Sequence, residues 1–215
     1  MAKLIFDESG KRFFEAGVEK CVLFPMNASG HYEKGVAWSG IIDVSEKPSG
    51  GESTPQWADN MKYINLTSAE EFSASISAYY YPNEFAKCDG SAELIKGITI
   101  GQQSRQSFGL AYMTGLGSDT TEDAGQKLHI IYGCKVSPSE KGYKTKSDNP
   151  EAITFSWEVK ATPVPVDGAK PTANATINSL DTDPAVWKKV CDAIYGTETK
   201  DSTILTPDEL KKLAG

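Results

Sequence analysis

The sequence predicts a mostly-β protein, an antiparallel β-sandwich or barrel with one packed α-helix and a short C-terminal helix. Three observations lead to this fold class. Apolar and polar residues alternate with a period of two along several segments, and helix-capping signals are few. The chain also has 215 residues, 39% of them hydrophobic, so a single domain can bury a sizeable core without disulfides or metal.

The alternation is clearest in three segments, residues 72–80, 128–136 and 153–160. In the first, apolar residues alternate with Ser73, Ser75 and Ser77, which gives the strand one apolar face and one face rich in hydroxyls. Shorter β-branched or aromatic runs predict further strands at residues 21–24, 36–44, 61–66, 98–100, 108–113 and 173–178. We therefore expect eight or nine strands, mostly half exposed and paired antiparallel.

Helix signals are concentrated near the C-terminus. Asp183 precedes a proline and predicts the start of a helix that ends before Gly196. A capping box that begins at Thr206 predicts a second, short helix through Leu213. One further turn of helix is expected at residues 83–88, stopped by Asp-Gly.

Composition excludes several classes of protein. The chain has 22 Lys and Arg against 29 Asp and Glu, a net charge of −7. This charge argues against a nucleic-acid-binding protein and against a polybasic protein that binds a membrane surface. No apolar stretch is long enough for a membrane helix. The four cysteines form no CxxC pair and the N-terminus has no apolar signal region. We therefore expect synthesis in a cytoplasm, with free thiols packed as small hydrophobic groups.

Catalytic motifs are not evident. The chain has two histidines, His31 and His129, and no GxSxG, HExxH or P-loop sequence. A Ser/His/Asp or Cys/His site needs a base held against a nucleophile and oriented by a third group, and no such set stands out. The sequence thus predicts a protein that is not an enzyme, with no catalytic residue, cofactor or metal site.

Two long connections, Ser45–Asn60 and Pro138–Pro150, are predicted to be loops because both are rich in Gly, Pro and Ser. Long loops inside a compact domain are usually functional. Each carries an aromatic residue that either anchors a partner surface or folds back onto its own domain. The residues expected to contact a partner surface are Trp57, Asp59, Tyr143, Lys144 and Lys146.

An ordered series of segments resembles the major tail proteins, or tail-tube proteins, of long-tailed (siphovirus-type) bacteriophages. The series begins with Phe6-Asp-Glu-Ser-Gly-Lys-Arg-Phe13 and continues through Trp57-Ala-Asp-Asn-Met-Lys-Tyr-Ile-Asn-Leu66 to Cys88-Asp-Gly90. It goes on with Gly97-Ile-Thr-Ile-Gly-Gln-Gln103 and with Pro150-Glu-Ala-Ile-Thr-Phe-Ser-Trp157. The resemblance is collinear and covers nearly the whole chain.

The resemblance implies a structural virion protein. Six copies would form a ring, and rings would stack head-to-tail into a hollow tail tube that conducts genomic DNA into the host cell. The implied partners are other copies of the chain, a tape-measure protein, and tail terminator and distal tail proteins. DNA would pass without specific binding, helped by acidic walls that repel phosphate, and this chain would not insert into a membrane.

The chain is expected to be one tube-forming domain, residues 1–200, followed by a short helical tail, residues 201–215. It departs from the family in one respect, because many members append an immunoglobulin-like domain and none is expected here. Hydroxyl-rich strand faces suit a water-filled channel, so Ser73, Ser75 and Ser77 are candidates to face the lumen. The alternative interpretation is a non-enzymatic β-sandwich binding or adhesion module.

Overall fold

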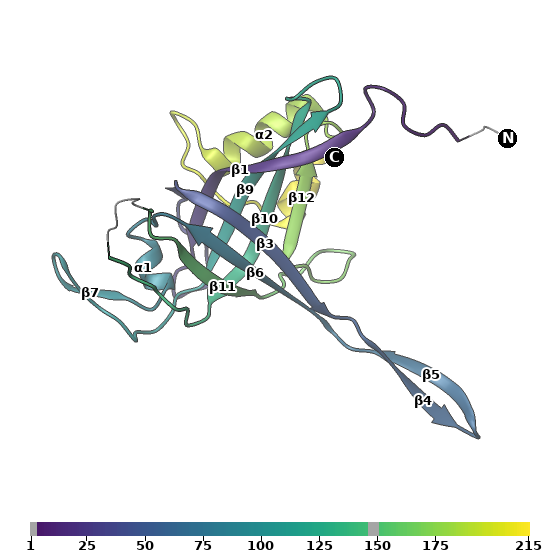
Figure 1. Ribbon diagram of the computed structural model, residues 1–215, viewed down its shortest axis with the longest axis horizontal. Helices are drawn as coiled ribbons and strands as arrows, with labels where there is room; N and C mark the ends of the chain where they lie inside the picture. The colour runs from purple at the N-terminus through teal and green to yellow at the C-terminus, as the bar shows by residue number, and fades with distance from the viewer. Residues whose placement is uncertain (1–3, 146–150) are drawn as a thin grey trace.

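The computed structural model describes residues 4–145 and 151–215, and one antiparallel sheet of eight strands is at its centre (Figure 1). Along this sheet the order is β2-β1-β9-β10-β11-β6-β3, and β12 pairs with β10 beside that path. The mostly-β, antiparallel fold class is confirmed. The eight strands are β1 (Phe13–Pro25), β2 (Val36–Trp38), β3 (Ile41–Gly50), β6 (Glu70–Ala78), β9 (Phe108–Ser118), β10 (Gly125–Val136), β11 (Phe155–Ala161) and β12 (Asn174–Asn178).

The sheet curves back on itself. Its two end strands, β2 and β3, are consecutive in the chain and are separated only by Ser39 and Gly40. Gly40 has a φ of +83°, a left-handed conformation that glycine adopts at low cost. The long strand β10 contributes to both halves, because it pairs with β9 and β12 over its first part and with β11 at Lys135 and Val136. The strands therefore wrap around one core as an open barrel, in which the end strands β2 and β3 are joined by a short turn and are not paired with each other.

The interior of the barrel is an apolar core with an aromatic centre. The ring of Phe85 lies 4.4 Å from that of Trp38 and 5.0 Å from that of Trp157, measured between centroids. Phe85 begins α1 (Phe85–Cys88), the expected single turn of helix. The alternating positions of β6 point as predicted, with Ala74 and Ile76 fully buried. Cys21, Cys88 and Cys134 are free thiols in the buried core, and burial raises the pKa of Cys88 to about 12.

Two helices cover the outer face of β1, β9 and β10 and create a second core. These are α2 (Pro184–Tyr195) and α3 (Pro207–Ala214). The Asp183 side chain accepts hydrogen bonds from the N–H groups of Ala185 and Val186, and Thr206 forms a full capping box, so both predicted starts are confirmed. Tyr132 on β10 donates to the Leu205 carbonyl at 2.8 Å. Over the described residues, no helix is both long and apolar enough to span a membrane.

The prediction of a loop over Ser45–Asn60 is wrong. Residues to Gly50 continue β3, and the chain then forms β4 (Ser53–Ala58) and β5 (Met61–Thr67). Prolines are tolerated here because β3 and β4 each have one unpaired edge, where a missing N–H breaks no ladder bond. With the small hairpin of β7 (Ala92–Ile95) and β8 (Ile98–Ile100), the described residues contain twelve strands, more than the eight or nine expected.

Candidate assembly surfaces

A two-stranded hairpin, β4 and β5, projects far from the barrel (Figure 1). We call residues 53–67 the arm. It extends the β3–β6 ladder, which runs as far as the pair Gly50 and Glu70. At its tip, Asp59 and Asn60 have φ values of +50° and +58°. Two successive left-handed residues are typical of the tight turn that matches the twist of a hairpin, and Asp and Asn tolerate this conformation.

The arm exposes large apolar side chains on both of its faces. Every residue of β4 and β5 is exposed, including Trp57 at 68% and Tyr63 at 74%. Alternation along β5 places Ile64 and Leu66 on one face and Met61 and Tyr63 on the other. An isolated two-stranded hairpin is marginally stable in water, and a large exposed apolar surface marks an interaction site. The arm thus presents an apolar surface that the rest of the described chain leaves uncovered.

The sequence prediction found only part of this surface. It named Trp57 and Asp59, which lie at the end of β4 and in the tip of the arm. It did not name Tyr63, Ile64 and Leu66. The sequence did contain a signal for these exposed apolar residues. The run Met61–Leu66 has apolar residues on both faces of the strand, whereas the flanking segments are too polar to cover both faces.

A second exposed hairpin, β7 and β8, projects at the opposite end of the molecule, next to α1 (Figure 1). Leu94, Ile95 and Ile98 are at least half exposed there. The sequence predicted β8 but not β7. The molecule therefore has an apolar hairpin at each end, and the N-terminal segment, with Leu4, Ile5 and Phe6 exposed, projects from the barrel as well (Figure 1).

The second predicted loop contains Tyr143 and Lys144. Its described part, residues 138–145, has no regular strand or helix, Tyr143 is 73% exposed and Lys144 is also exposed. Lys146 lies outside the described residues. The loop is held by Lys141, which pairs with Asp89 and lies 5.4 Å from the ring of Tyr81. Tyr143 therefore lies in an irregular loop, whereas Trp57 lies in strand β4 of the arm.

The three serines form a row on the outer surface of the barrel. Ser73, Ser75 and Ser77 are half-buried residues of β6, on the face opposite the core. Their cross-strand neighbours on β3 and β11 continue this polar surface, which we call the serine face. Its charged members have both signs, and Lys47 pairs with Glu158 at 2.9 Å. The neighbours are Asp43, Ser45 and Lys47 on β3, and Ser156, Glu158 and Lys160 on β11.

His129 belongs to a polar cluster where β1, β9 and β10 meet. Its Nε2 lies 3.0 Å from Glu15 Oε1 and 3.1 Å from Thr114 Oγ1, and its ring stacks on Tyr112. Burial raises the pKa of Glu15, but hydrogen bonds from Lys127, Thr114 and His129 outweigh it and lower the pKa to about 2. The carboxylate and the hydroxyl share one nitrogen of the imidazole, whereas a catalytic triad uses both. The cluster therefore links β1, β9 and β10 through hydrogen bonds and an ion pair.

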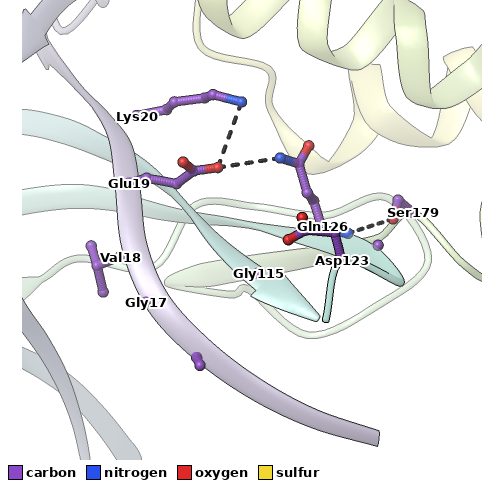
Figure 2. A pocket seen from close by; sticks show the side chains of 10 residues that line it. Gly17, Val18, Glu19, Lys20, Gly115, Asp123, Gln126 and Ser179 are labelled. Carbon is purple, nitrogen blue, oxygen red and sulfur yellow. Dashed lines mark hydrogen bonds and ion pairs between the residues drawn. The ribbon is translucent and has the colours of Figure 1, made fainter. Parts of the chain in front are cut away.

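A cavity of about 770 Å³ lies beside β1 where this strand bulges away from β9 (Figure 2). Gly17 and Lys20 have left-handed φ values of +74° and +51° and produce the bulges. The Glu19 carboxylate accepts from the Gln126 side chain at 3.2 Å and pairs with Lys20 at 3.5 Å. The lining residues include no histidine or cysteine, and no group of His, Cys, Asp and Glu among the described residues can hold a metal ion.

Comparison with known proteins finds no matching family model and no matching curated protein. Among solved structures, the chain is similar to one in the cryo-EM structure of the anti-feeding prophage (AFP) baseplate, 6-fold symmetrised. The TM-score is 0.38 and the sequence identity 10%, over 81% of this chain and 97% of that chain.

Proposed function

We propose that this chain is a structural subunit of a phage-tail-type tube, in which hexameric rings stack head-to-tail around a channel for DNA. The observation that carries the proposal is the arm, a two-stranded hairpin with exposed apolar side chains that none of the residues in 4–145 and 151–215 covers. The ordered sequence resemblance to tail-tube proteins supports the same function. Residues 1–200 would form the tube unit, and residues 201–215 would follow it as a helical tail.

The arm suits contact with another copy of the same subunit. It projects from one end of the molecule, and the β7–β8 hairpin projects from the other (Figure 1). When one end of a subunit binds the opposite end of the next, the contact is heterologous and repeats without limit. A filament or a stack of rings is the expected product. Such an assembly also covers the open edges of β3 and β4, which would otherwise invite uncontrolled association.

The serine face is our candidate for the lumen. Hydroxyls and charges of both signs form a wetted surface without an apolar patch to which a passing polymer would adhere. On this face Asp43 and Glu158 are matched by Lys47 and Lys160, so low adhesion rather than strong repulsion of phosphate is the property it offers. In the virion, the tube ends would meet the terminator and distal tail proteins, and the tape-measure protein would occupy the channel before DNA.

Electron microscopy of the purified protein tests the proposal. Tubes or stacked rings with a central channel are expected at high protein concentration. A protein that stays monomeric at high concentration, across a range of salt concentrations and with assembly partners added, would contradict it. A monomer that instead binds a cell surface would favour the adhesion module.

A further inference from the structure

The chain has two arginines, and one of them has no acidic partner among the described residues. Arg105 lies in the segment between β8 and β9 and is half-buried, and its Nε is buried without a hydrogen-bond partner. No carboxylate of the described residues lies within ion-pair distance of its guanidinium. Because an arginine stays charged at any physiological pH, a half-buried one without an acid partner is costly.

The segment that follows α1 supports the Arg105 side chain. The backbone N–H of Gln103 donates to the Gly90 carbonyl at 2.9 Å, and that of Gln106 donates to the Lys87 carbonyl at 3.1 Å. Gly90 has a φ of +78°, and a Cβ on it would lie 3.1 Å from Arg105 Cζ. The guanidinium therefore packs directly against a glycine at the end of α1, which fixes its position before any partner arrives.

Arg105 lines a pocket of about 290 Å³ in which the Gln106 amide donates to the Met26 carbonyl, while Arg105 and Asn27 supply N–H donors. The side-chain oxygen of Asn27, Oδ1, already accepts from the backbone N–H groups of Ser29 and His31, both at 3.0 Å, which leaves the side-chain NH₂ of Asn27 available as a donor. Ser107 adds a hydroxyl. No acidic side chain lines the pocket, so its chemistry suits a carboxylate. The lining residues are Met26, Asn27, Ala28, Arg105, Gln106 and Ser107.

A suitable carboxylate is found at the other end of the molecule. Asp59 occupies the turn at the tip of the arm, is exposed, and has no hydrogen-bond or ion-pair partner among the described residues. The Arg105 pocket lies beside α1, at the end of the molecule opposite the arm (Figure 1). A head-to-tail contact between two copies brings these two ends together.

We propose that the Arg105 pocket binds the Asp59 carboxylate of a second copy of this chain. The Arg105 guanidinium would form a bidentate hydrogen-bonded ion pair with the Asp59 carboxylate, and the Asn27 amide would be a further donor. The neighbouring Trp57 would then cover apolar surface around the pocket. This inference rests on the proposed function, because it names the site that receives the arm.

Charge reversal tests the pairing. Self-association is measured by sedimentation velocity over a range of concentrations, with electron microscopy of the same samples, for wild type, Arg105→Glu, Asp59→Lys and the double variant. Each single reversal is expected to weaken self-association by about tenfold or more, since it places like charges together. The double variant is expected to recover most of this loss. As a matched control, Asp59→Lys with Lys189→Glu has the same net charge as the wild type but changes an exposed lysine of α2 instead of the pocket.

The outcomes separate the inference from the proposed function. Recovery in the Arg105–Asp59 double variant but not in the Lys189 control supports the pairing. Assembly that is unaffected by Arg105→Glu, or recovery in both double variants, overturns the pairing and leaves the tube proposal in place. A wild-type protein that does not self-associate overturns both. The milder pair Arg105→Gln and Asp59→Asn, with a thermal melt of each variant, shows whether any loss comes from misfolding.

Discussion

Removal of the Trp57 side chain should separate assembly from folding. Trp57 is 68% exposed in the subunit. With about 200 Å² of side-chain surface and about 25 cal/mol per Å², the part already buried contributes roughly 1.5 kcal/mol, and the part still exposed would contribute roughly 3.4 kcal/mol on docking. We therefore expect Trp57→Ala to weaken self-association by roughly 100- to 300-fold, while the subunit loses at most about 1.5 kcal/mol of stability.

The assay combines two measurements on the same protein. Sedimentation velocity gives the concentration at which assembly begins, and urea unfolding followed by circular dichroism gives the free energy of unfolding. Tyr79→Ala is the matched control, because Tyr79 is 54% exposed but lies directly after β6, where its N–H donates to the Gly40 carbonyl, and not in the arm. If Trp57→Ala unfolds the barrel, or if it assembles like the wild type, the arm is not the docking element.

The pKa of Glu15 is lowered from 4.5 to about 2, so its contribution to stability is present above about pH 4.5 and is lost as the pH falls toward 2; a stability difference between wild type and Glu15→Gln that stays constant over this range would contradict it. Gly133→Ala should cost roughly 1–3 kcal/mol in urea unfolding, because Gly133 has a φ of +56° and a Cβ would lie 2.6 Å from the Thr162 carbonyl oxygen; a loss below about 0.5 kcal/mol would refute the reasoning. Ser75→Cys with Cys191→Ser, labelled with a heavy-atom maleimide, should show density inside the channel of assembled tubes, and density outside would exclude the serine face from the lumen.

The elements that the sequence predicted are those with a local signal. Alternation located β6, β10 and β11, because a strand with one buried face must repeat with a period of two. The helices α2 and α3 were located by Asp183 and Thr206, whose side chains satisfy the backbone N–H groups of the first turn. These signals depend only on residues close together in the sequence, so they can be recognised without knowledge of the tertiary structure.

The arm and the Arg105 pocket could not be predicted in this way. Prolines and glycines normally indicate a loop, and only the pairing of β4 with β5 shows that the segment is extended. The pocket depends on contacts between segments far apart in sequence, since Met26 and Asn27 follow β1 whereas Arg105 precedes β9. The rarity of arginine was the one available signal, and it does not identify a partner.

We propose that one copy of the chain binds another through the arm. Hydrogen exchange tests it most directly, by comparing dilute monomer with assembled protein. We expect the amides of residues 53–67 to exchange quickly in the monomer, where both strands are exposed, and to become strongly protected on assembly, while the protection of the barrel core changes little. Assembled protein in which the arm still exchanges as fast as in the monomer would contradict the account.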